Sequence, residues 1–162
     1  MRRGWIFAAE NGEPFAKSIR DGAVQPIKAS RVVETPHVRL CESFESGHSS
    51  HGTSSKVAEE LGVHLEPLRM DSQAKYAAVA SGMADAYLRL PTRPDYREKI
   101  WDHAAGAFIL EQAGGRVSDV LGNNLDFSKG RTLKNNRGVV ATARGVHQEV
   151  VDVVSPYFMN RI

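Results

Sequence analysis

The chain has 162 residues, of which 41% are hydrophobic and 25% are charged, and this is the composition of one ordinary globular domain. The formal net charge is only +2, without the basic stripe and interleaved aromatic residues that nucleic-acid binding requires. The single cysteine, Cys41, excludes an internal disulfide and a cysteine-rich zinc site, which favours a reducing compartment.

The N-terminal part of the chain begins with a short apolar segment. Trp5, Ile6 and Phe7 predict a first strand, and Asn11-Gly12 is a turn signal that ends it. This segment is too short for the apolar region of a signal peptide, and no apolar run reaches the ~18 residues of a membrane span. We therefore expect a soluble, cytoplasmic protein without a membrane partner. Residues 10–36 contain three prolines and many charges, and we expect mostly loop there, with room for one edge strand.

From residue 37 onward, strand patterns alternate with helix patterns. Strands are expected at residues 37–42, 63–70, 84–90, 116–120 and 138–142. Helices are expected at residues 53–62, 73–81, 100–113 and 144–158. Cys41 falls inside the first of these strands, where the expected role is that of a buried core residue. Strands that alternate with helices of this length predict an α/β fold, a layered αβα sandwich around a mixed, mostly parallel sheet.

Two helix openings carry polar residues that could bind a ligand. Ser72 and Lys75 are three residues apart and share a face, so a hydroxyl and an ammonium could meet a phosphate there. The alternative is that Asp71 or Ser72 only caps the helix and Lys75 is solvated. Asp102 opens the helix of residues 100–113 before small residues that allow close approach, and a carboxylate is the ligand that Mg²⁺ prefers. The alternative is a carboxylate that only interacts with the helix dipole.

Two further polar segments have less specific patterns. His48 and His51 are three residues apart in a polar loop, but no third ligand completes a zinc site. The stretch from Asp126 to Arg144 is basic and is read most simply as a solvated loop, with a strip that faces an anion as the alternative. Glycine-rich phosphate loops and the Gly-x-Ser-x-Gly nucleophile motif are both absent from the sequence.

Several motifs in the second half of the chain occur in an order and spacing typical of one enzyme family. The segment Trp101-Asp102-His103-Ala104-Ala105-Gly106, followed by Glu111-Gln112-Ala113-Gly114-Gly115 and Leu125-Asp126-Phe127, resembles the C-terminal signature of the inositol monophosphatase superfamily. These are Mg²⁺-dependent phosphatases that Li⁺ inhibits. Other segments resemble the 3′(2′),5′-bisphosphate nucleotidases within that superfamily: residues 47–51, 71–76, 84–91, 98–100 and 130–133.

This resemblance implies hydrolysis of the 3′-phosphate of 3′-phosphoadenosine 5′-phosphate, which gives AMP and phosphate. It extends to the sulfated form, 3′-phosphoadenylyl sulfate. By position in the motifs, the resemblance implies that Asp102 binds both Mg²⁺ and substrate. It also implies nucleotide contacts by His48, Ser72, Lys75 and Arg89. An arginine at position 89 favours a second anionic group on the substrate, because guanidinium groups make charge-assisted hydrogen bonds to phosphates.

The resemblance covers only the C-terminal domain of these two-domain enzymes. The resemblance does not include the family's metal-binding Glu-Glu and Asp-Pro-x-Asp-Gly-Thr motifs, which hold most of its metal ligands. We therefore expect residues 1–162 to form one domain that is inactive alone, with a surface exposed for the N-terminal domain or for self-association. Two other functions stay open: an inactive nucleotide-binding or regulatory module, and a fragment of an inositol or sugar phosphatase.

Overall fold

A five-stranded sheet forms the centre of the structure, a computed structural model that describes residues 4–44 and 51–159. Its order is β5-β4-β6-β8-β7. The strands are β4 (Leu40–Glu42), β5 (Leu68–Arg69), β6 (Ala86–Arg89), β7 (Gly115–Ser118) and β8 (Val139–Ala143). β4 is parallel to β5 and β6, whereas β8 is antiparallel to both β6 and β7. Four strands therefore run one way and β8 runs the other, which confirms the prediction of a mixed, mostly parallel sheet.

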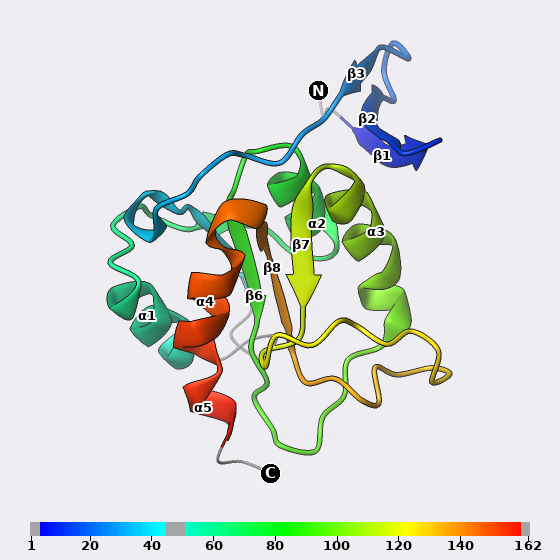
Figure 1. Cartoon of the computed structure of the whole chain (residues 1–162). Coiled ribbons are helices and arrows are strands. Elements are labelled where there is room, and N and C mark those ends of the chain that lie inside the picture. The colour runs from blue at the N-terminus through cyan, green and yellow to red at the C-terminus, as the bar shows by residue number, and fades with distance from the viewer. Residues whose placement is uncertain (1–3, 45–50, 160–162) are drawn as a thin grey trace.

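Helices cover both faces of this sheet (Figure 1). They are α1 (His51–Glu60), α2 (Ala74–Ala80), α3 (Ala104–Gln112) and α4 (His147–Val154). In β6, Tyr87 joins a core that contains residues of α2 and α3, while Leu88 joins a second core with residues of α1 and α4. The two side chains reach different cores because successive residues of a strand point to opposite faces. The predicted αβα sandwich is confirmed.

Two of the expected helices are broken. The segment 100–113 divides into a 3₁₀ turn, η3 (Ile100–Asp102), and α3, with His103 between them at φ −133° and ψ −35°, outside the helical region. The segment 144–158 divides into η4 (Arg144–Val146), α4 and α5 (Pro156–Met159). Pro156 has no N–H to continue the hydrogen bonding of α4. The helices of residues 4–44 and 51–159 are all too short or too polar to cross a membrane.

A separate three-stranded sheet lies at one end of the molecule, formed by β1 (Trp5–Glu10), β2 (Glu13–Ser18) and β3 (Val24–Pro26). Asn11 and Gly12 form the β1–β2 turn with φ values of +51° and +83°, and Asn-Gly tolerates the positive φ angles that tight hairpin turns need. Most of residues 10–36 lie outside strands, as expected, but the segment contains two strands, β2 and β3, where one edge strand was expected. The prolines do not prevent pairing, because the carbonyl of Pro14 still accepts a hydrogen bond, from the N–H of Ile27 at 3.1 Å.

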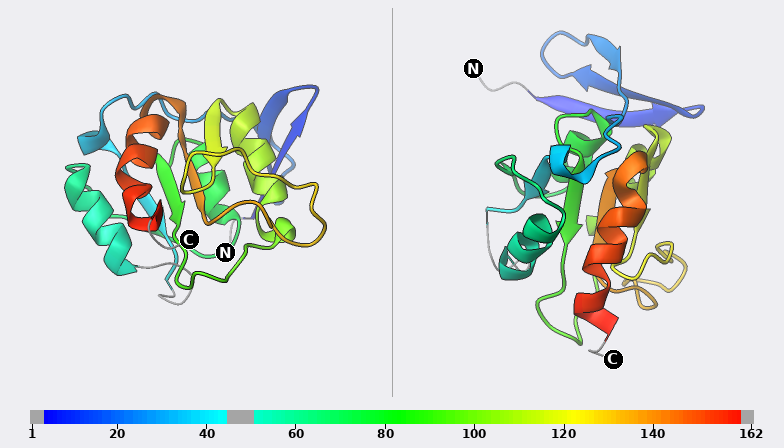
Figure 2. Two further views of the ribbon diagram at one scale, coloured as in Figure 1. Left: turned by 60° about the horizontal axis from the view of Figure 1, so that its bottom comes forward. Right: turned by 60° about the vertical axis from the view of Figure 1, so that its left-hand side comes forward.

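The small sheet buries one side and exposes apolar residues elsewhere. Ala16 and Ile27 belong to the core that contains α2 and α3, and Phe7 packs against it. Ile6, Ile19 and Val24 are each more than half exposed, at 52%, 65% and 61%. Figure 2 shows the small sheet projecting beyond the rest of the fold. The structure thus has an exposed apolar surface at this end.

Cys41 lies in β4 and is 1% exposed. Burial raises the pKa of its thiol to about 11, although the nearby Lys75 ammonium acts in the opposite direction. A thiol with so high a pKa stays protonated and unreactive at neutral pH. The prediction that Cys41 is a buried core residue is confirmed.

Candidate functional site

Four of the five residues expected to bind a ligand line one cavity of about 490 Å³. They are Ser72, Lys75, Arg89 and Asp102, and the cavity is completed by Gln73, Tyr87 and His103. The fifth, His48, lies outside the described residues. The cavity forms where β6 ends, where α2 begins and where η3 passes into α3, and in α/β sheets such edges are where ligands bind.

Residues before α2 fix the cavity's rim. Ser72 has a positive φ of +63°, and its hydroxyl oxygen accepts a hydrogen bond from the N–H of Ala74 at 3.3 Å. Gln73 joins this rim to the start of α3: its amide nitrogen donates to the carbonyl of Trp101 and its amide oxygen accepts from the N–H of Gly106, both at 2.9 Å. The openings of two helices are thus tied together by one side chain.

Lys75 is buried beneath the cavity, with 3% of its surface exposed. Its ammonium donates to the carbonyl of Met70 at 3.3 Å and lies 5.1 Å from the centre of the Tyr87 ring. Burial lowers the pKa of Lys75, and no carboxylate within the described ranges forms an ion pair with it. The alternative that Lys75 is merely solvated was therefore wrong. A buried ammonium that lines a cavity and forms no ion pair with a described residue is suited to bind an anion.

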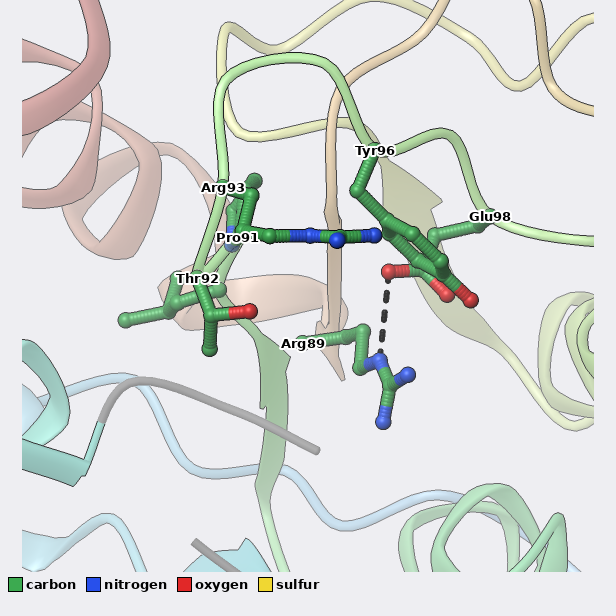
Figure 3. A pocket seen from close by; sticks show the side chains of 7 residues that line it. Arg89, Pro91, Thr92, Arg93, Tyr96 and Glu98 are labelled. Carbon is green, nitrogen blue, oxygen red and sulfur yellow. Dashed lines mark hydrogen bonds and ion pairs between the residues drawn. The ribbon is translucent and has the colours of Figure 1, made fainter. Parts of the chain in front are cut away.

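Arg89, the last residue of β6, is held by a carboxylate (Figure 3). Its Nε lies 3.2 Å from Oε1 of Glu98, whose side chain is only 4% exposed. Burial alone would lower the pKa of Arg89, but the Glu98 carboxylate outweighs it and the pKa is raised. Because this bond uses only Nε, the terminal nitrogens of the guanidinium stay available to a ligand.

Glu98 continues this contact into a buried hydrogen-bonded chain. Its other carboxylate oxygen lies 3.2 Å from Nε2 of His103, and Nδ1 of His103 lies 2.8 Å from the hydroxyl of Tyr76. Both bonds are satisfied by one neutral tautomer, in which Nε2–H donates to Glu98 and the Tyr76 hydroxyl donates to Nδ1. Burial would raise the pKa of Glu98, but the hydrogen bond from His103 and the charge of Arg89 lower it. Glu98 is therefore held in its charged form.

A second cavity of about 410 Å³ shares Arg89 with the first, and Glu98 lines only this second cavity. It is also lined by Thr92, Arg93 and Tyr96. Figure 3 shows the Arg93 side chain extending toward the Tyr96 ring, and its guanidinium carbon lies 5.8 Å from the ring centre. The two neighbouring cavities thus combine two guanidinium groups with hydroxyl and aromatic side chains.

Asp102 is exposed on η3 at the rim of the first cavity. The described residues contain no group of three or more His, Cys, Asp or Glu side chains that could hold a metal ion. Mg²⁺ requires near-octahedral oxygen coordination, which one exposed carboxylate cannot supply. These residues therefore do not form a magnesium site by themselves, and Asp102 can contribute one ligand to such a site.

Four residues that organise the cavity were not among the ligand-binding residues expected from the sequence. They are Gln73, Tyr76, Glu98 and His103. Each belongs to one of the motifs quoted above, but its role depends on contacts between segments 5 to 33 residues apart in the sequence. A partial signal was available in His103, a large polar residue at a helix opening that is otherwise made of small residues.

Comparison with known proteins places this chain in a family. The family model described as "Inositol monophosphatase family" matches residues 4–156, nearly the whole chain. The chain belongs to the inositol monophosphatase family. Among curated members, a protein of Schizosaccharomyces pombe named 3′(2′),5′-bisphosphate nucleotidase is 45% identical over 150 residues, which are 91% of this chain and 42% of the relative. A protein of Oryza sativa with the same name is 42% identical over 93% of this chain and 42% of its own length.

Solved structures of family members share the fold at lower identity. SuhB of Mycobacterium tuberculosis superposes with a TM-score of 0.65 at 21% identity, covering 95% of this chain and 55% of that one. Inositol monophosphatase from Anabaena superposes with a TM-score of 0.61 at 21% identity, covering 89% and 57%. This chain therefore spans less than half the length of the curated family members that it matches.

Proposed function

We propose that this chain supplies the nucleotide-binding half of a 3′(2′),5′-bisphosphate nucleotidase. The reaction is hydrolysis of the 3′-phosphate of 3′-phosphoadenosine 5′-phosphate to AMP and phosphate, with 3′-phosphoadenylyl sulfate as a second substrate. The relatives that carry this name match about nine-tenths of this chain. This chain matches only 42% of the length of each of these relatives. We therefore propose the activity for this chain combined with the metal ligands and the water-activating group that the rest of such an enzyme supplies.

The observation that supports this substrate class is the pair of cations in one cavity. Lys75 is buried without an ion-pair partner in the described part of the chain, and Arg89 keeps its terminal nitrogens free of Glu98. Two cationic groups at one site suit a ligand with two anionic groups, since each can form a charge-assisted hydrogen bond. Ser72 adds a hydroxyl at the same rim. A bisphosphate fits this arrangement better than an inositol monophosphate, which has one phosphate and several neutral hydroxyls.

The metal ions are proposed to bind only in the completed enzyme. Asp102 is the one ligand that we assign to this chain, and the remaining ligands and the group that activates water belong to the part of the relatives that this chain does not match, in cis or in trans. The need for metal ligands from elsewhere also leaves a second candidate function. Because the described residues lack a metal-binding cluster, the chain could instead be a module that binds the nucleotide without turnover.

Phosphate release separates the two candidates. The chain would be incubated with 3′-phosphoadenosine 5′-phosphate and Mg²⁺, alone and with the part of the S. pombe relative that it does not match. We expect release only in the mixture, and we expect Asp102→Asn to reduce it strongly. Binding without turnover in any mixture would favour the binding module. Turnover by the chain alone would contradict the assignment of the metal ligands.

Substrate class is tested separately with the same mixture. Inositol 1-phosphate at matched concentration should be hydrolysed more slowly than the adenosine bisphosphate. Arg89→Glu should reduce hydrolysis of the bisphosphate, because a carboxylate repels the second anionic group. Equal rates on both substrates, or faster hydrolysis of inositol phosphate by the unaltered chain, would favour an inositol phosphatase.

A further inference from the structure

Arg137 is a buried cation that forms no ion pair within the described part of the chain. It lies just before β8 and is 9% exposed. Its Nη1 donates to the carbonyl of Phe158 in α5 at 3.2 Å, but its Nε has no hydrogen-bond partner. No carboxylate in residues 4–44 or 51–159 forms an ion pair with it. Its guanidinium carbon lies 6.0 Å from the centre of the Phe158 ring. Burying a guanidinium without a counter-charge is costly, and a bound anion would offset that cost.

Arg137 lines a cavity of about 440 Å³ that is separate from the site described above. Two further cations line it, Lys134 and Arg97. Lys134 is exposed, while Arg97 is half-buried and donates through Nη1 to the carbonyls of Pro94 and Tyr96, both at 2.9 Å. The basic stretch of residues 126–144 is therefore not simply a solvated loop, because Arg137 is buried.

Two carboxylates line the same cavity, Asp119 and Asp95. Asp119 is buried, and its oxygens accept hydrogen bonds from the N–H groups of Leu121 and Asn123 and from the side-chain amides of Asn123 and Asn136. Its lone pairs are thus used by neutral donors instead of Arg137. Asp95 is exposed to solvent, where its repulsion of an anion is screened.

We propose that this cavity binds a small tetrahedral oxyanion, phosphate or sulfate. The anion would accept hydrogen bonds from the Arg137 guanidinium and the Lys134 ammonium. The side-chain amides of Asn123 and Asn135, which line the cavity and each donate one N–H to a carboxylate, would hold its remaining oxygens with the other N–H. This site does not rest on the proposed nucleotidase function, because it shares no lining residue with the cavity of Lys75 and Arg89.

Nuclear magnetic resonance of the full chain provides a direct test. The protein would be titrated with inorganic phosphate, with sulfate, and with chloride at equal ionic strength. We expect phosphate and sulfate, but not chloride, to shift the Arg137 guanidinium and the side-chain amides of Asn123 and Asn135. The side-chain amide of Gln73 reports the other cavity. Shifts at Gln73 only, equal shifts with chloride, or no shifts would each overturn the proposal.

Three variants locate the binding site. Arg137→Gln should weaken phosphate binding by about tenfold or more, the loss expected for a charged hydrogen bond. Lys134→Gln should weaken it about two- to fivefold, and because Lys134 is exposed this variant keeps the test valid if Arg137→Gln fails to fold. The matched control is Arg144→Gln, an exposed arginine at the opposite end of β8, which should bind as the unaltered chain does. Equal affinity in all folded variants would overturn the proposal.

Discussion

Arg89 is the residue on which the proposed preference for a bisphosphate depends. Replacing it with alanine removes a cation that lines both neighbouring cavities. We expect Arg89→Ala to weaken binding of 3′-phosphoadenosine 5′-phosphate by about 1.5 to 3 kcal/mol, the value of a charged hydrogen bond. Isothermal titration calorimetry on the folded chain measures this, with Arg144→Ala as the control. Unchanged affinity would remove Arg89 from the site.

Glu98 and Arg89 form a buried pair whose coupling can be measured. Glu98→Gln keeps the size of the side chain but leaves Arg89 without its counter-charge, and we expect a loss of about 1 to 3 kcal/mol in the free energy of unfolding. In the double variant Arg89→Ala, Glu98→Gln, the loss should be smaller than the sum of the two single losses by about 1 kcal/mol. Urea denaturation of the four proteins gives the comparison. Strict additivity would show that the pair contributes no coupling.

His147 makes the stability depend on pH. At the start of α4, its ring nitrogens lie 2.9 and 3.0 Å from the hydroxyl oxygens of Thr142 and Ser118, and burial, with a smaller effect of Arg116, lowers its pKa to about 4. The unfolded chain takes up a proton near pH 6.5, whereas the folded chain does so only near pH 4. Stability should therefore fall as the pH drops from 6.5 to 4, by up to about 3 kcal/mol, and level off below.

The measurement is the free energy of unfolding at a series of pH values. His147→Asn removes the titrating group while keeping a side chain that can bond to a hydroxyl. As the pH drops from 6.5 to 4, the free energy of unfolding of the unaltered chain should fall relative to that of His147→Asn, by up to about 3 kcal/mol. Parallel pH profiles would contradict the buried, neutral state of His147.

Among the elements, helices α2 and α3 pack closely because residue 106 of α3 is a glycine. A Cβ at Gly106 would lie 2.4 Å from the nearest atom of the Tyr76 ring. We expect Gly106→Ala to cost about 1 to 3 kcal/mol in the free energy of unfolding despite the better helix propensity of alanine. It should also weaken nucleotide binding, because Tyr76 supports His103 and Glu98. Gly52→Ala in α1, where nothing lies within 4 Å, is the control and should not destabilise.

Elements with a local signal could be predicted, and those fixed by distant contacts could not. The apolar patterns placed β6 and β8 correctly, because both strands are buried by neighbours on two faces. By contrast, the break at His103 arises where its side chain turns toward Glu98 and Tyr76, and apolar periodicity holds no information on that turn. Only one strand was expected where β2 and β3 form, because prolines and charges outweighed a pairing that Asn11-Gly12 starts.

For the whole molecule, the three-stranded sheet is the surface most suited to self-association. Ile6, Ile19 and Val24 are exposed there. We predict that the chain forms a dimer or larger species at high concentration, and that Ile6→Lys with Val24→Lys shifts it toward monomer. Analytical ultracentrifugation over a hundredfold concentration range provides the measurement, with the exposed pair Lys129→Glu, Lys134→Glu as a control for charge change. A monomer at every concentration would contradict the prediction.

The candidate site shows the same division between local and distant information. Resemblance to a family selected Ser72, Lys75, Arg89 and Asp102, which lie in three separate segments, and the fold brings them to one cavity. Spacing alone would have left Lys75 solvated, since only the packed sheet reveals its burial. Likewise, the basic stretch of residues 126–144 carries no mark that distinguishes the buried Arg137 from its exposed neighbours.

Cys41 offers a practical consequence. As the only sulfhydryl in the chain, it sits in the central sheet with 1% of its surface exposed. An alkylating reagent can modify it only when β4 is uncovered, so the labelling rate reports how often the sheet opens. Without any engineered probe, mass spectrometry of the alkylated fraction over time would compare the opening of each variant named above under native conditions.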